Sequence, residues 1–292
     1  MPMSQSTFGK KFTVTTWGES HGKALGTVVD GVPAGLFLTE ADIQAYLNRR
    51  KPGQSRYTTA RNEGDEVEIL SGVFEGQTTG TPISMIVRNK DQRSRDYGNI
   101  AQTYRPGHAD FGFDSKYGFR DYRGGGRSSG RETIGRVAAG AIAARILKEL
   151  GITLQAYTLS IGPVSCHSYH PEIIPENSFY MPDMVAAEKA AKYLEKCMKE
   201  EDSAGGVVEC RISGVPAGIG DPVFGKLDAA FAQALMSIGA VKAVEIGDGV
   251  KVSTMKGSEN NDGFHMENGR IVKTTNHSGG ILGGISDGGE IL

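Results

Sequence analysis

The chain has 292 residues, of which 38% are hydrophobic and 23% charged, with 41 glycines and a formal net charge of −2. This length allows a sizeable core in one large domain or two packed halves, whereas the near-neutral charge argues against a protein that coats nucleic acid or an anionic membrane. Three widely spaced cysteines and the absence of a long apolar run give no sign of a disulfide framework, a zinc ribbon, a signal peptide or a membrane span, so we expect a cytoplasmic protein without a metal.

Short runs rich in Val, Ile and Thr, bounded by Gly or Pro, predict β-strands. In chain order they are residues 13–17, 26–30, 67–74, 83–87, 153–161, 206–213 and 241–246. Helical periodicity lies between them. Thr39 is a candidate cap for a first helix, the clearest pattern runs from Ile134 to Leu150, and residues 184–200 form a surface helix. These elements predict an α/β (α+β) fold.

The pentapeptide GVPAG occurs at residues 31–35 and again at 214–218, each time after a strand-like run and before an amphipathic helix. Chance recurrence of a short turn is one explanation, and internal duplication is the other. In the second copy, Asp221 and Pro222 predict a helix start. The apolar stripe of that helix would be Leu227, Ala230, Phe231, Ala234, Leu235 and Ile238. We expect two pseudo-duplicated α/β halves within a single domain, residues 1–292, without a linker.

Arginines and glycines alternate in RDYRGGGRSSGRE, residues 120–132, directly ahead of a helical pattern. Glycines let backbone amides approach a ligand, and a helix start at Ser128 or Ser129 would add free N–H groups and the positive end of the helix dipole. The arginines at positions 120, 123, 127 and 131 supply forked donors that match phosphate or carboxylate. The segment predicts an anion site; a solvated turn is the alternative.

Three other patterns fall short of known ligand sites. Residues 220–227, GDPVFGKL, match a phosphate loop except that Leu227 replaces the hydroxyl that would hold magnesium. The glycines at 124–130 lack the dinucleotide-binding spacing because Ser129 stands at the third glycine position. Cys166, His167 and His170 lie in a polar, turn-rich stretch without a fourth ligand, which favours an exposed loop over a metal site.

Two histidines on predicted turns are candidates for proton transfer. His21 lies in GESHG, and His108 lies in RPGHAD, followed two residues later by Asp110. Imidazole titrates near neutrality, and loops often present functional groups, although a lone loop histidine is more often a surface residue. A glycine-dense segment at 276–291 either packs flat against an aromatic cofactor or is a tight crossing of two backbones.

Seven motifs together resemble the chorismate synthase family over nearly the whole chain. They are GESHG, DGVPAG, RRKPGQSRYTTAR, DQRSRDY, RPGHAD, RDYRGGGRSSGRET and NHSGGILGGISDG, at residues 18–22, 30–35, 49–61, 91–97, 105–110, 120–133 and 276–288. The resemblance implies a lyase of the shikimate pathway that converts 5-enolpyruvylshikimate 3-phosphate to chorismate and phosphate by 1,4-anti elimination. It also implies a β-α-β sandwich, a cytoplasmic homotetramer and aromatic amino acid biosynthesis.

The same resemblance implies a flavoprotein that needs reduced FMN, with FAD and NADP as associated nucleotides and NADPH as a reductant. No reductase segment is visible, so we expect external reduction. His21 and His108 correspond to the proton-handling histidines of the family, His108 near the reduced flavin and His21 near the departing phosphate. The flavin contacts are Arg127, Ser128, Ser129, Gly239, Ala240 and Gly283. Arg50 and Arg56 match positions for phosphate-bearing ligands, NADP among them, and we assign them to substrate anions.

Family members continue beyond the GGIS segment into a KPTS-type strand and a GRHDP motif, whereas this sequence ends at Leu292. We expect weaker flavin binding, and loss of a base for the ring proton, in a chain truncated there. Two other functions remain open at this point. A non-catalytic anion-binding or assembly subunit would bind ligand without turnover, and a phosphate-ester hydrolase would release phosphate without reduced flavin.

Overall fold

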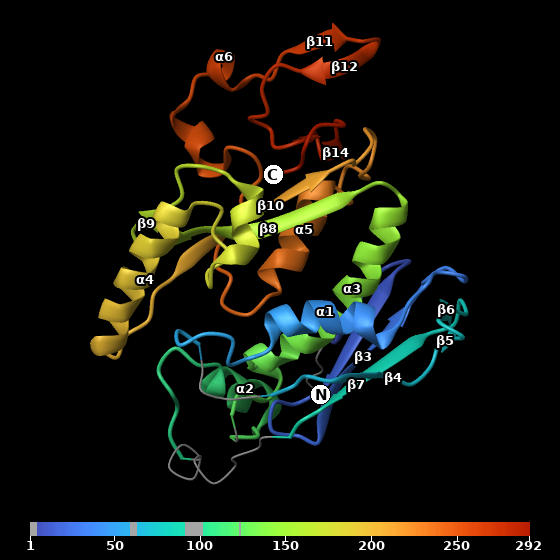
Figure 1. Ribbon diagram of the computed structural model, residues 1–292, viewed down its shortest axis with the longest axis vertical. Helices are drawn as coiled ribbons and strands as arrows, with labels where there is room; N and C mark the ends of the chain where they lie inside the picture. The colour runs from blue at the N-terminus through green and yellow to red at the C-terminus, as the bar shows by residue number, and fades with distance from the viewer. Residues whose placement is uncertain (1–4, 59–62, 91–101, 123) are drawn as a thin grey trace. The chain divides into compact units, whose positions relative to one another are not determined.

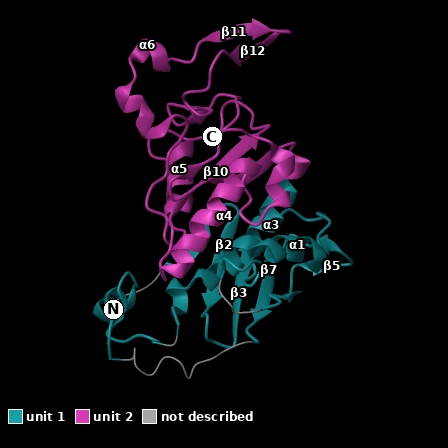
Figure 2. Ribbon diagram, turned by 60° about the vertical axis from the view of Figure 1, so that its left-hand side comes forward, with its two compact units in different colours: residues 1–146 teal, residues 147–292 magenta. Residues whose placement is uncertain are grey.

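The computed structural model describes residues 5–58, 63–90, 102–122 and 124–292 (Figure 1). The chain divides into two units, Met1–Ile146 and Leu147–Leu292, which Figure 2 shows in separate colours. Both units combine helices with antiparallel strands, which confirms the predicted mixed α/β class. Among the described residues, no helix combines the length and apolar character needed to cross a membrane.

The first unit is built on a five-stranded antiparallel sheet with the order β1-β2-β3-β7-β4. The strands are β1 (Thr7–Gly9), β2 (Thr13–Gly18), β3 (Ala24–Asp30), β4 (Val67–Ile69) and β7 (Ile83–Arg88). The predictions at 13–17, 26–30 and 83–87 are confirmed.

The predicted strand at 67–74 is instead two strands, β4 and β5 (Val73–Phe74), the second of which pairs with β6 (Gln77–Thr78). The break falls at Gly72, whose backbone is left-handed with φ +82 and where a β-carbon would lie 2.7 Å from both Ile83 Cγ1 and Pro82 O. A residue held in this way cannot continue a strand.

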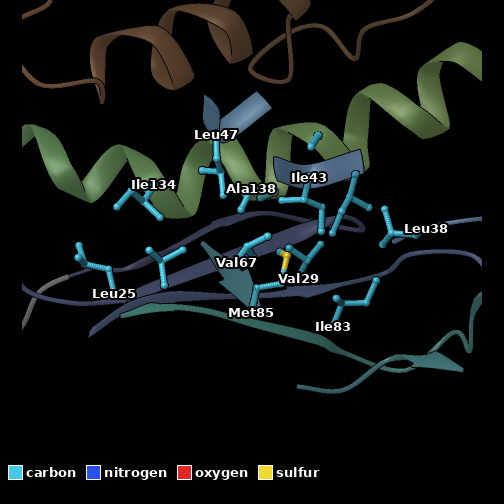
Figure 3. Close-up of a cluster of buried hydrophobic side chains, with 14 of the residues drawn as sticks. Leu25, Val29, Leu38, Ile43, Leu47, Val67, Ile83, Met85, Ile134 and Ala138 are labelled. Atoms are coloured by element: carbon cyan, nitrogen blue, oxygen red, sulfur yellow. The ribbon is translucent and has the colours of Figure 1, made fainter. Parts of the chain in front are cut away.

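Two helices, α1 (Glu40–Arg50) and α3 (Thr133–Glu149), cover one face of this sheet with the core between them (Figure 3). Alternation along β7 buries Ile83, Met85 and Val87 on that face. The labelled core residues are Leu25, Val29, Val67, Ile83 and Met85 from the strands, Leu38 from the loop before α1, and Ile43, Leu47, Ile134 and Ala138 from the helices. The predicted helix from Ile134 is therefore confirmed.

The predicted cap of α1 is also confirmed. Thr39 precedes the helix. The backbone N and the Oγ1 of Thr39 donate hydrogen bonds to the Asp42 carboxylate, at 2.8 and 2.7 Å. These bonds satisfy groups at the helix start that have no partner within the helix, and they hold the pKa of Asp42 below its usual value.

The second unit has a three-stranded antiparallel sheet with the order β10-β8-β9. Its main elements are β8 (Thr153–Ile161), β9 (Val164–Ser165), α4 (Met184–Lys199), β10 (Gly206–Ser213) and α5 (Leu227–Met236). The short α6 (Gly257–Asn260) and two hairpins follow, β11 (Phe264–Glu267) with β12 (Arg270–Lys273), and β13 (Ile281–Leu282) with β14 (Ile285–Ser286). The predictions at 153–161, 184–200 and 206–213 are confirmed.

Two predictions in this unit are wrong. Residues 241–246 form no strand; their apolar pattern is satisfied by side-chain packing, since Ile246 contacts the cluster of Ile212, Ile281 and Ile291. Helix α5 starts at Leu227 and not at Asp221, because the Asp221 amide bonds to Gly225 O at 2.9 Å and closes a tight turn before the helix.

The predicted apolar stripe of α5 is only partly covered within the described residues. Leu227 and Phe231 pack on the cluster that contains Ile212, whereas Leu235 is 40% exposed and Ile238 36% exposed. Leu227 and Phe231 therefore add partly buried contacts to the core of the unit, whereas Ala230 is exposed.

The two GVPAG copies start in the same way. Gly31 and Gly214 each follow the last residue of a strand and adopt left-handed backbones, with φ +80 and +85. A β-carbon would lie 1.8 Å from Lys11 O in the first copy and 2.2 Å from Gly151 O in the second. Only glycine fits where the chain turns this closely against the segment that leads into the neighbouring strand.

The two copies are also fastened in the same way, by Thr78 in the first and Ser286 in the second. Each hydroxyl donates to the carbonyl of the proline in its copy, Pro33 (2.6 Å) or Pro216 (2.7 Å). Each also accepts from the amide of the residue after the copy, at 3.0 and 2.9 Å. The similarity of the two pentapeptide copies thus extends to tertiary contacts with residues outside the pentapeptide.

Candidate active site

A cavity of about 600 Å³ in the first unit is the candidate active site. Its lining residues are Glu19, His108, Ala109, Asp110, Phe113, Tyr117, Phe119, Arg120, Asp121, Gly124, Gly125, Gly126, Arg127 and Ser128. One side is aromatic, because Phe113 and Tyr117 lie one turn apart on α2 (Asp110–Tyr117) with ring centroids 5.5 Å apart. Sequence reasoning missed this wall, for which the four-residue spacing of two rings was the available signal.

Asp110 organises the polar side of the cavity. Its carboxylate accepts two hydrogen bonds of 2.8 Å from Nε and Nη2 of Arg105 and lies 3.4 Å from Nε of Arg120. The Arg105 side chain is the largest cause that holds the pKa of Asp110 well below its usual range. Asp110 therefore remains an anion although it is buried.

His108 is clamped at one ring nitrogen. Its Nδ1 lies 2.9 Å from Asp110 Oδ1 and 3.2 Å from Arg105 Nη2. An Nδ1–H can donate to the Asp110 carboxylate in both the neutral and the protonated ring, so this contact favours the tautomer that carries its hydrogen on Nδ1. Nε2 is then the nitrogen that would exchange a proton with a ligand in the cavity.

The glycine run joins His108 to the second predicted histidine. The Gly124 carbonyl accepts from Arg105 Nη2 at 2.7 Å, the same atom that contacts His108. On its other side, Gly124 packs so closely on His21 that a β-carbon would lie 2.3 Å from the His21 Nδ1. His21 Nδ1 also lies 3.1 Å from Ser20 Oγ. The structure thus brings together both histidines, which are far apart in sequence.

Arg127 and Ser128 line the cavity, as the sequence predicted for a ligand site, but much of the Arg127 guanidinium binds protein. It donates to Gly18 O (3.2 Å) and to Thr16 Oγ1 (2.7 Å). Within the described residues, Nε and one Nη1 hydrogen of Arg127 keep no protein partner. The Ser128 hydroxyl donates to Gly125 O at 2.7 Å and retains its acceptor capacity.

Ser129 has a local structural role. Its Oγ accepts from the Arg131 amide at 3.3 Å and caps the 3-10 turn Gly130–Glu132, which leads directly into α3. The predicted helix start at this serine is confirmed. Ser129 is not among the residues that line the cavity.

The four arginines of the glycine-rich segment do not share one task. Arg120 lies between Asp110 and Asp114, with Nη1 2.6 Å from Asp114 Oδ2. Arg131 is only 6% exposed and binds Asp65, so its charge is neutralised inside the protein. Arg123 lies outside the described residues. The expectation that all four point their donors at one anion is therefore wrong for Arg120 and Arg131.

Arg50 and Arg56 belong to the first unit but do not line the cavity. Nη2 of Arg50 lies 3.2 Å from Oδ2 of the fully buried Asp65. Arg56 donates to the Tyr57 hydroxyl at 2.7 Å, and its guanidinium carbon lies 4.9 Å from the centre of that ring. Arg61 and the motif at 91–97 lie outside the described residues.

The remaining predicted flavin contacts, Gly239, Ala240 and Gly283, lie in the second unit. A β-carbon on Gly239 or Gly283 would meet nothing within 4 Å, so both face open space. In contrast, a β-carbon on Gly280 would lie 2.5 Å from Glu290 O. The glycine-dense segment therefore contains a tight backbone crossing at Gly280, which is the second of the two alternatives, and an open turn at Gly283.

Within the residues that the structure describes, no group of three or more His, Cys, Asp or Glu side chains is placed to hold a metal ion. This holds for Cys166, His167 and His170, where the loop is organised instead by Asp183, whose carboxylate accepts from the His167 amide at 3.0 Å.

Comparison with known proteins relates both units to one family. The protein-family model described as "Chorismate synthase" matches residues 12–292. The chain is 64% identical to a chorismate synthase of Lachnoclostridium phytofermentans and 63% identical to one of Agathobacter rectalis, in each case over 99% of this chain and 80% of the relative. It is also similar to a solved structure titled "Crystal Structure of Chorismate Synthase", with a TM-score of 0.82, 33% identity, and coverage of 97% of this chain and 83% of that one.

Proposed function

Because this chain belongs to the chorismate synthase family, we propose that it converts 5-enolpyruvylshikimate 3-phosphate to chorismate and phosphate by a 1,4-anti elimination that requires reduced FMN. The chain is an enzyme of chorismate formation, and thus of aromatic amino acid biosynthesis. The mechanism, the cofactor and the roles of individual residues are part of this proposal.

The observation that carries the proposal is the pair of histidines on either side of Gly124. The elimination removes a ring proton and expels phosphate, so it needs groups that can move protons near neutral pH. His108 meets this need through a ring whose Nδ1 is held by Asp110 and Arg105 while it lines the cavity. We assign His108 to proton control at the reduced flavin and His21 to the region of the departing phosphate.

The substrate carries two carboxylates and a phosphate and therefore needs positive partners. Arg127 would supply one through the donors that Thr16 and Gly18 leave unused. Arg50 and Arg56 remain proposed anion ligands in the first unit, although Arg50 already shares its charge with Asp65. The Arg56 guanidinium donates a hydrogen bond to the Tyr57 hydroxyl and lies over the Tyr57 ring, and these two contacts orient it.

The residues present fit a flavin in two respects. The cavity wall combines aromatic rings with glycines, and a β-carbon at Gly126 would meet no protein atom within 4 Å, which leaves room for a ligand to approach the backbone. Arg127, Ser128 and Ser129 of the first unit would hold it, and Gly239, Ala240 and Gly283 are proposed flavin contacts on the family resemblance alone. When bound, reduced FMN would supply electron density to the reacting ring; NADPH is a proposed external reductant.

The test is anaerobic turnover of 5-enolpyruvylshikimate 3-phosphate with and without photoreduced FMN. We expect chorismate and phosphate in equal amounts only with reduced FMN. Phosphate release without reduced flavin would identify a phosphate-ester hydrolase, and flavin binding without turnover would identify a binding subunit. A cytoplasmic homotetramer built from a single family domain belongs to the same proposal and is supported by the family membership alone.

A further inference from the structure

We propose that Asn89 is a positioning residue that holds the turn carrying His21 in its working geometry. Asn89 directly follows β7, and its side-chain Nδ2 donates to Gly22 O at 2.8 Å and to Glu19 O at 3.1 Å. Its backbone amide donates to Lys23 O at 3.2 Å. One residue therefore binds carbonyls on both sides of His21. The proposal rests on the proposed proton-handling role of His21.

The turn that carries His21 spans residues 19–22. Within it, the Gly22 amide bonds to Glu19 O at 3.1 Å, which closes residues 19–22 into a single turn. The two carbonyls that flank His21 point toward one side chain, and a pair of N–H donors on one nitrogen is what an amide supplies. A carboxylate of the same shape would present oxygen to oxygen.

Arg131 fixes which way the Asn89 amide faces. Its Nε and Nη2 donate to Asn89 Oδ1 at 3.2 and 2.9 Å, so the oxygen must face the arginine and the nitrogen must face the turn. The four bonds use both hydrogens and both acceptor sites of the amide. An amide satisfied in this way has one orientation.

Arg131 is in turn anchored by a buried anion. Its Nη1 lies 3.0 Å from Asp65 Oδ1, and the other oxygen of Asp65 lies 3.2 Å from Arg50. The side chains of Arg131 and Asp65 are 6% and 0% exposed. A continuous set of polar contacts thus runs from the end of α1 through Asp65, Arg131 and Asn89 to the His21 turn. Asp65 anchors Arg131 through ion pairing, whereas two hydrogen bonds from Arg131 hold the Asn89 amide.

His21 is consequently held from two directions. Asn89 fixes the backbone of its turn, and Gly124 limits the space next to its ring, where a β-carbon would lie 2.3 Å from Nδ1. Small displacements of a catalytic group lower turnover steeply, and an error of about 1 Å can cost about 100-fold. Asn89 contributes through His21 and does not itself line the cavity.

The test is the Asn89→Asp variant, which keeps the shape and the acceptor for Arg131 but replaces the two donors by an anion facing two carbonyls. We expect kcat to fall about 10- to 100-fold with little change in KM. Asn48→Asp is the matched control, since Asn48 is exposed on α1 and the substitution adds the same charge. Asn89→Ala, which removes the donors without adding a charge, is the second variant should Asn89→Asp fail to fold.

Two readouts separate positioning from general damage. The ring resonances of His21, assigned with His21→Ala, should shift in Asn89→Asp while those of His108 stay in place. In a His21→Ala background, the Asn89 substitution should lower kcat no further. Unchanged His21 resonances would overturn the proposal. So would an Asn89 substitution that lowers kcat as much in the His21→Ala background as in the wild type. Should the wild-type chain show no turnover at all, the proposed function fails, and the His21 resonances alone decide whether Asn89 positions the turn.

Discussion

Gly124 lies against the ring of His21, so closely that a β-carbon on Gly124 would be 2.3 Å from the His21 Nδ1. The carbonyl of Gly124 accepts a hydrogen bond from Arg105, which also contacts His108. A single glycine therefore sets the space between the two histidines. Its left-handed backbone, with φ +70, adds a second reason why a larger residue does not fit.

Replacing this glycine tests the contact. Gly124→Ala should lose about 1–2 kcal/mol of stability from its backbone conformation and should lower turnover by displacing His21. Gly76→Ala is the matched control, because Gly76 has φ +74 but a β-carbon there meets nothing within 4 Å. Denaturant unfolding should show similar losses for both, and steady-state kinetics a lower kcat for Gly124→Ala alone. Equal kcat values in the two variants would contradict the contact.

Removal of either imidazole should have a large effect on turnover. With His108→Ala or His21→Ala we expect kcat to fall about 10²- to 10⁴-fold, since proton transfer by a positioned side chain contributes that much. FMN affinity, measured by fluorescence titration, should stay near that of the wild type. His170→Ala, at a side chain 54% exposed in the second unit, is the control. Full activity of both histidine variants would refute the assigned roles.

The cap of α4 should give the second unit a measurable pH dependence. The Asp183 carboxylate accepts hydrogen bonds from the His167 and Ala186 amides, each at 3.0 Å. These bonds lower the pKa of Asp183 to about 2, and the bond from His167 has the largest effect. An unfolded Asp titrates near about 4. Since the folded-state pKa is the lower one, this stabilisation is complete above about pH 4 and is lost as the pH falls toward about 2.

Asp183→Ala should therefore destabilise the protein by about 1 kcal/mol at neutral pH, as expected for the loss of a helix cap. Urea unfolding at a series of pH values should show the difference from wild type shrinking through the acid window. Glu188→Ala, exposed on the same helix, should change stability by less than about 0.5 kcal/mol. A pH-independent difference for Asp183→Ala would argue against the charged cap.

The repeated turns predict matching losses in both units. Thr78→Val and Ser286→Ala each leave one backbone amide of the turn without its acceptor, which should cost about 1–3 kcal/mol. Thr78→Ser keeps the hydroxyl and should cost less than Thr78→Val. Unfolding free energies from denaturant titration compare the three. A large loss in one unit and none in the other would show that the two turns differ in function within the fold.

Many of the elements could be predicted because their signals are local. Val, Ile and Thr runs located β8 and β10 with their observed bounds, Thr39 was identified as the cap of a first helix, and a helix start was predicted at Ser128 or Ser129. The wrongly predicted strand at 241–246 lies where a long-range contact overrode the local pattern. Ile246 packs against the cluster of Ile212, Ile281 and Ile291 and belongs to no strand.

By itself, the sequence determined which kinds of side chain the site would contain, because imidazoles between turn residues and arginines among glycines are recognisable from their chemistry and immediate neighbours. Only the tertiary structure decided what each one contacts. Arg127 and Arg131 stand four residues apart, yet the first lines the cavity while the second is buried against Asp65. Asn89 reaches the His21 turn across nearly 70 residues of chain. Such partners depend on which strands and loops the fold brings together, and local sequence patterns do not specify these long-range contacts.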